Sequence, residues 1–231
     1  MAASGKPKNL SVIVDNTGSV QMQGFMIEKA VISTVLNDSN RFAAGDSAAI
    51  WAFGTPSPPP QLFGDFTSSS VALDTALNSI PLGTPVSNAL ETSYEALNHH
   101  AATDPAGMNA VVLNFDGENR FNVPVDLVVM TSLETNVLVY PMGFYTADLN
   151  MISDLATGGY SYYNANRLSM VTQGDYLAAY DEMLAHMDKA YVLTWETTGA
   201  SGVEVDVRIS VDYSAANGSW SYNDIGAYTV P

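Results

Sequence analysis

Apolar residues along this chain fall into two patterns that alternate. Short continuous apolar runs predict buried strands, and longer segments with an apolar residue at every third or fourth position predict helices. The predicted strands are 10–15, 46–54, 61–66, 109–117 and 136–144, with a short one within 157–165, and the predicted helices are 22–38, 69–79, 85–100, 122–135, 146–157 and 174–190. This alternation predicts a doubly wound α/β fold, in which helices flank both faces of a mostly parallel central sheet.

The pattern changes after residue 190, where apolar and polar residues begin to alternate with a period of two. The segments that do so are 191–197, 202–213 and 218–230, with turn residues between them. We therefore predict an α/β domain at 9–193 and a small antiparallel β extension at 194–231. Residues 1–8 are expected to be a disordered start or a remnant of the expression vector.

The charge balance excludes one class of partner. The chain has 24 acidic and 8 basic residues, a net charge of -16, and this surface would repel nucleic acid and anionic membranes.

There is no cysteine, which excludes disulfides and thiolate metal sites. No run approaches the ~18 apolar residues of a membrane span, and the first residues lack the apolar core of a signal peptide. We expect no nucleic-acid partner and no direct insertion into a membrane.

Oxygen-bearing side chains follow the predicted strands at the positions where a parallel sheet binds ligands. Asp15 ends the first strand and is followed by Thr17 and Ser19. Thr84 precedes a predicted helix, and Asp116 comes directly after VVLNF. Ligands of open α/β sheets bind at the carboxyl ends of the strands, so these side chains are expected to converge. Carboxylates and hydroxyls are ligands for hard divalent cations such as Mg²⁺ or Ca²⁺.

Other interpretations of the first loop remain open at this point. Asp15 alone could cap a helix. Aspartate-nucleophile phosphatases also use Mg²⁺ at the end of a strand, but they typically have a second Asp two residues after the first, where this chain has Thr17. Neither a G-x-S-x-G elbow nor a phosphate-binding G-x-x-x-x-G-K-[ST] loop is present. We therefore predict that the chain is not an enzyme.

The segments DNTGS, GTP and FDGEN resemble the metal-ion-dependent adhesion site (MIDAS) of von Willebrand factor A (vWA) domains. That site has the pattern Asp-x-Ser-x-Ser, a distant Thr and a distant Asp. The segments TPVSNAL, VLVYPMGF and LATGGYSYYNA resemble further parts of the family, so the resemblance extends from residue 9 to about 193. It implies a Rossmann-like vWA fold. It also implies a site for Mg²⁺, or for Ca²⁺ or Mn²⁺, whose residues are Asp15, Thr17, Ser19, Thr84 and Asp116.

Two residues depart from the family pattern. Thr17 stands where the family usually has serine and keeps the hydroxyl. Asn114 and Phe115 precede Asp116 where the family often has threonine, which is expected to alter packing and not metal ligation.

The resemblance implies a cation-dependent binding or adhesion module. Its metal would bridge to a carboxylate of a protein or glycan partner, with Asn16, Glu118 and Asn119 at the rim of the site. We expect it at a bacterial cell surface or in a secreted adhesin. The alternative is a non-adhesive scaffold or assembly subunit with a structural metal, including a partner of an intracellular ATPase. A Mg²⁺-dependent phosphatase-like enzyme is the third possibility.

Overall fold

The structure, a computed structural model, describes residues 7–54, 61–83, 89–103, 106–116 and 123–188, together with the backbone of 204–215 and 218–229. Six strands form the main sheet in the order β3-β2-β1-β4-β5-β6. Their bounds are β1 Lys8–Val14, β2 Ser47–Ala52, β3 Gln61–Thr67, β4 Met108–Phe115, β5 Leu138–Phe144 and β6 Tyr162–Asn164. All neighbouring strands are parallel except β2 and β3. The sheet is therefore mostly parallel with an antiparallel edge strand.

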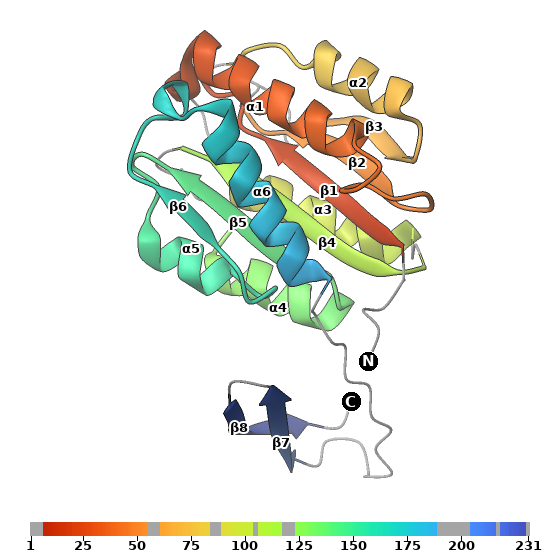
Figure 1. Ribbon diagram of the computed structural model, residues 1–231, viewed down its shortest axis with the longest axis vertical. Coiled ribbons are helices and arrows are strands. Elements are labelled where there is room, and N and C mark those ends of the chain that lie inside the picture. The colour runs from red at the N-terminus through yellow and green to blue at the C-terminus, as the bar shows by residue number, and fades with distance from the viewer. Residues whose placement is uncertain are drawn as a thin grey trace. The chain divides into compact units, whose positions relative to one another are not determined.

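Helices cover both faces of this sheet (Figure 1). Their bounds are α1 Gln21–Asn37, α2 Ser70–Ser79, α3 Ala89–Thr103, α4 Val125–Thr135, α5 Leu149–Leu155 and α6 Gln173–Met187, with short 3₁₀ helices η1 Gly18–Val20 and η2 Leu168–Met170. Helices α1, α2 and α6 share one hydrophobic core, and α3, α4 and α5 share the other. The predicted doubly wound α/β fold is confirmed, because both faces of the sheet are buried under helices.

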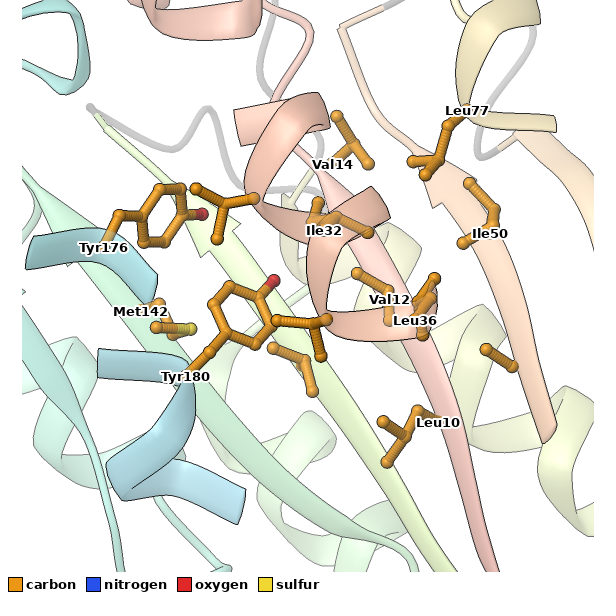
Figure 2. Close-up of a cluster of buried hydrophobic side chains, with 14 of the residues drawn as sticks. Leu10, Val12, Val14, Ile32, Leu36, Ile50, Leu77, Met142, Tyr176 and Tyr180 are labelled. Carbon is orange, nitrogen blue, oxygen red and sulfur yellow. The ribbon is translucent and has the colours of Figure 1, made fainter. Parts of the chain in front are cut away.

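Strand β1 shows why the central strands are apolar without interruption. Leu10, Val12 and Val14 point into the core under α1 and α6, as Figure 2 shows, and Ile13 belongs to the opposite core. Each of these side chains is at most 1% exposed. A strand buried on both faces has no solvent side on which a polar residue would be favourable.

Side-chain caps determine several helix starts. The Asp148 carboxylate accepts hydrogen bonds from the first turn of α5, and the Ser69 hydroxyl accepts one at the start of α2. The helix predicted at 122–135 begins only at Val125, after Pro124 in an extended conformation. Residue 85, the predicted start of α3, lies outside the described residues. None of the helices in the described residues is long and apolar enough to cross a membrane.

The chain divides into two compact units, Met1–Ala190 and Tyr191–Pro231. In the second unit β7, Glu204–Ala215, pairs with β8, Gly218–Thr229, as an antiparallel two-stranded sheet. The pairing runs without a register shift from Glu204 opposite Thr229 to Ala215 opposite Gly218. The predicted strand at 191–197 lies outside the described residues.

Candidate metal centre

The order of the strands reverses between β1 and β4, and the candidate residues lie there. From β1 the sheet continues through β2 to β3, and from β4 it continues through β5 to β6. Asp15 directly follows β1 and Asp116 directly follows β4. The two strands are parallel neighbours, with Ile13 opposite Leu113, so both carboxylates leave the sheet at the same edge. This is the switch point at which doubly wound sheets bind ligands.

Four of the predicted ligands form one continuous hydrogen-bonded group. Asp15 Oδ1 accepts from the backbone N of Thr17 at 2.9 Å and from Thr17 Oγ1 at 2.6 Å. Thr17 Oγ1 lies 2.7 Å from Ser19 Oγ, and Ser19 Oγ lies 2.6 Å from Asp116 Oδ1. The backbone N of Asp116 donates to Asp15 Oδ2 at 2.9 Å, which closes the ring.

The number of protons in this ring is too small for its contacts. From Asp15 Oδ1 through Thr17 Oγ1 and Ser19 Oγ to Asp116 Oδ1 there are three contacts between 2.6 and 2.7 Å. Thr17 and Ser19 supply one hydroxyl proton each. With both carboxylates ionised, one pair of oxygens would stand at hydrogen-bonding distance with no hydrogen between them. The ring is therefore balanced by a third proton or by a cation.

The pKa values of the two carboxyl groups also indicate that the ring requires a further proton or a cation. Burial, and then the charge of Asp116, raise the pKa of Asp15 to about 7. Burial also raises the pKa of Asp116. Asp116 Oδ2 is buried and has no hydrogen-bond partner among the described residues. An unpaired buried carboxylate oxygen is unfavourable, and a bound cation would compensate it.

A third acid, Glu28 of α1, contacts Asp15 of the ring. The sequence analysis did not identify it as part of the site. Its Oε1 accepts from the backbone N of Asp15 at 3.0 Å, and the residue is fully buried. Burial, and then the charge of Asp15, raise the pKa of Glu28 well above its usual value. A signal was present, because Glu28 stands between Phe25 and Ile32 on the buried face of the helix.

Asn114 lies two residues before Asp116, near the end of β4. Its Nδ2 donates to the carbonyl of Ile13 at 2.9 Å, and its Oδ1 accepts from the hydroxyl of Tyr176 at 2.6 Å. These bonds connect β4 to β1 and to α6, so Asn114 acts in packing. The residue is buried in the strand and forms no hydrogen bond to either carboxylate of the ring.

The structure places Asn16 differently from the predicted rim. Asn16 is fully buried, its Oδ1 accepts from the backbone N of Gly54 at 2.5 Å, and its Nδ2 donates to the carbonyl of Pro81 at 3.0 Å. The side chain therefore joins three loops and does not face a partner. Gly83 completes this contact, since its backbone N donates to the carbonyl of Asn16 at 2.6 Å.

The close approach of the backbone of Gly54 explains why residue 83 is glycine. A Cβ on Gly83 would lie 1.6 Å from the carbonyl oxygen of Gly54. Three predicted residues, Thr84, Glu118 and Asn119, lie outside the described residues.

The donor set consists of carboxylates and hydroxyls. Within the described ranges, His, Cys, Asp and Glu form no group of three or more that could hold a metal ion. The ring combines two carboxylates with two hydroxyl oxygens, and such all-oxygen sets suit Mg²⁺, Mn²⁺ or Ca²⁺.

The sequence matches no protein-family model and no curated protein. Three similar solved structures are of proximal thread matrix protein 1 (PTMP1) from the mussel byssus. Two of them are 14% and 12% identical, cover 80% and 82% of this chain, and have TM-scores of 0.58 and 0.61. The third, PTMP1 with a zinc-occupied MIDAS motif, is 13% identical, covers 77% of this chain and has a TM-score of 0.62.

This chain spans a little under half of each mussel protein, 45% to 47% of its length. At such low identity the likeness concerns the fold alone. The chain has a vWA-like α/β fold, with Asp15, Thr17, Ser19 and Asp116 gathered at the switch point of its sheet.

Proposed function

We propose that the chain is a divalent-cation-dependent binding module. Asp15, Thr17, Ser19 and Asp116 would hold the ion, joined by Thr84, which the family resemblance adds. The observation that carries this proposal is the ring of four oxygens with three short contacts and two hydroxyl protons. A cation among these oxygens removes the unfavourable contact, because each hydroxyl can present a lone pair to the ion.

The bound ion would supply positive charge at one point of an acidic surface. The chain has a net charge of -16, so an acidic partner would otherwise be repelled. A divalent ion inverts the local charge and can accept a carboxylate as a further ligand. We propose that the partner is a protein or an acidic glycan that presents this carboxylate. We further propose a site of action at a bacterial surface or in a secreted protein.

Titration with metal ions tests the site. Isothermal titration calorimetry with Mg²⁺, Mn²⁺ and Ca²⁺ is expected to show one site in the wild type. Asp116→Ala removes a proposed ligand, so we expect the affinity to fall by at least about 100-fold, the upper range for loss of an outer-shell partner. Asp154→Asn, at an exposed position of α5, is the matched control and should bind as the wild type does. Absence of binding of all three ions to the wild type would overturn the proposal.

The bridging step needs a separate measurement. Mn²⁺ bound to the protein enhances the relaxation of water protons. Acetate is expected to reduce this enhancement, because it displaces a water molecule from the ion. Acetate should therefore lower the relaxation enhancement of the Mn²⁺-loaded wild type. Free Mn²⁺ at the same acetate concentration is the reference.

One observation favours a second function. The similar structures are of a thread matrix protein, which suggests a scaffold or assembly role in which the metal only stabilises the loops. Chelation would then lower the melting temperature, while acetate would leave the relaxation of protein-bound Mn²⁺ unchanged.

A further inference from the structure

Next to the ring, Tyr145 and Arg167 form an exposed pair that the proposed metal site does not use. Arg167 Nη2 donates to the Tyr145 hydroxyl at 2.9 Å, and the guanidinium lies over the Tyr145 ring, 4.2 Å from its centroid. Tyr145 is 36% exposed, and Arg167 is partly exposed. The pair therefore presents a positive planar group at the surface.

The turn that carries Tyr145 is attached directly to the candidate metal centre. Thr146 donates to the carbonyl of Asp116 through its backbone N at 3.4 Å and through its hydroxyl at 3.2 Å. Arg167, which donates to the Tyr145 hydroxyl, is thus connected through this turn to Asp116 of the ring.

Tyr145 is held in a conformation that a bulky residue rarely adopts. Its φ is 53°, in the left-handed region. The backbone N of Tyr145 donates to the carbonyl of Asn164 at 2.8 Å, and the Tyr163 hydroxyl donates to the carbonyl of Tyr145 at 2.7 Å. Several bonds therefore maintain a strained backbone that turns the aromatic ring toward Arg167. Strain of this kind concentrates at functional sites.

Arg167 differs from Lys8 and Arg41, two other cations that the structure describes. Lys8 is paired with Asp46 and Asp188, and Arg41 with Asp38 and Asp181. Within the described residues no carboxylate forms a salt bridge with Arg167, and Tyr145 Oη is its hydrogen-bond acceptor. A guanidinium has five N–H donors, so most of them remain available. Their planar arrangement matches the two oxygens of a carboxylate.

We propose that Arg167, oriented by Tyr145, is a specificity-determining residue that binds a second acidic group of the partner. The occupant is an acidic peptide segment with neighbouring Asp or Glu side chains. One carboxylate binds the metal and another binds the Arg167 guanidinium. The inference rests on the proposed function, because the first contact is the metal bridge. It adds the requirement that the partner segment carries at least two acids.

The experiment compares a probe with several carboxylates and a probe with one. N-acetylated, C-amidated hexaglutamate and acetate are titrated into Mn²⁺-loaded protein at low ionic strength, with calorimetry as the measurement. For Arg167→Gln we expect the affinity for hexaglutamate to fall about tenfold, the usual effect of losing a hydrogen bond to a charged group. The affinity for acetate should change less than about twofold, since acetate reaches only the ion.

Three further variants make the result specific. Lys29→Gln removes the same charge from α1, where the Lys29 amine lies over the Phe25 ring, and should leave both affinities unchanged. Arg167→Lys keeps the charge but not the planar guanidinium, so we expect an intermediate loss of affinity for hexaglutamate. This variant also serves in place of Arg167→Gln if Arg167→Gln folds poorly. Tyr145→Phe removes the hydroxyl that orients the guanidinium. It should lower the affinity for hexaglutamate less than Arg167→Gln does and leave the affinity for acetate unchanged.

The outcomes separate the two proposals. Equal affinity of the wild type and Arg167→Gln for hexaglutamate overturns this inference while the metal bridge stands. An equal loss for both probes also overturns it, because Arg167 would then act through the ion. If chelation leaves the binding of hexaglutamate unchanged, Arg167 works without the metal and the two-point contact is wrong. If Mn²⁺ does not bind at all, both proposals fail.

Discussion

Gln21 has a backbone conformation that few residues with a side chain adopt. Its φ is 58° and its ψ is 163°, at the junction of η1 and α1, two residues after Ser19. Only glycine enters this region without strain, and each such residue costs about 1–3 kcal/mol. The segment that carries three of the proposed ligands, Asp15, Thr17 and Ser19, thus ends in a strained residue.

We expect Gln21→Gly to raise the free energy of unfolding by about 1 kcal/mol, because the relief of strain exceeds the ~0.5–1 kcal/mol that glycine costs through backbone entropy. Urea denaturation measures the change. Gln23→Gly, also at an exposed position but inside α1, is the matched control and should lower stability by about 1 kcal/mol. A loss of stability in both variants would show that Gln21 is not strained.

At the scale of the elements, the packing of η2 against α1 places Arg167, which precedes η2. Gly24 of α1 makes this contact possible. A Cβ at this position would lie 2.9 Å from the backbone N of Ser169 and 3.2 Å from the carbonyl carbon of Leu168. Backbone atoms cannot move aside as a flexible side chain can, so a larger residue would push η2 away from the helix.

We therefore expect Gly24→Ala to destabilise the protein by about 1–2 kcal/mol, although alanine favours the helix. It should also weaken the binding of hexaglutamate, because Arg167 moves with η2. Gly174→Ala in α6 is the control, since the nearest atom to its new Cβ, Thr172 Oγ1, is 3.7 Å away. That variant should gain about 0.5 kcal/mol from helix propensity. Thermal unfolding and calorimetry measure the two effects, and unchanged stability of Gly24→Ala would contradict the argument.

At the scale of the whole molecule, the carboxylate ring couples folding to pH and to metal. Asp15 has a pKa of about 7 in the folded protein, above its usual 3.8. When folding raises the pKa of a carboxyl group, protonation of that group stabilises the folded state, and ionisation removes this stabilisation. Without metal, its contribution to stability is therefore lost as the pH rises from about 4 through 7. A bound cation competes with this proton and reverses the trend.

We expect the gain in melting temperature from Mg²⁺ over chelator to be small at pH 5 and several degrees at pH 8. Free ligand at about 100 times Kd adds about 2.7 kcal/mol. Asp116→Asn keeps an acceptor for the Ser19 hydroxyl and removes one charge. In chelator at pH 8 it should melt about 2–4 °C above the wild type, the effect of roughly 1 kcal/mol on a domain of this size, and gain nothing from Mg²⁺.

Thermal scans at the two pH values provide the measurement, with Asp154→Asn on α5 as the control that should follow the wild type. A Mg²⁺ gain that is the same at both pH values would show that Asp15 does not exchange its proton for the metal.

The sequence alone was enough to predict the layers of the fold and the position of the candidate site. Apolar periodicity depends on neighbouring residues, so it identified the buried strands and the helices between them. The rule for parallel strand ends then brought together Asp15, Thr17, Ser19 and Asp116, which the structure joins in one ring.

The tertiary structure decided which polar residues are buried and what they contact. Asn16 and Glu28 are polar residues, yet both are fully buried because their partners, Gly54 and Asp15, are distant in the sequence. Tyr145 and Arg167 are 22 residues apart, and only the pairing of β5 with β6 and the packing of η2 on α1 bring them together. Such contacts depend on long-range packing, which local sequence patterns do not contain.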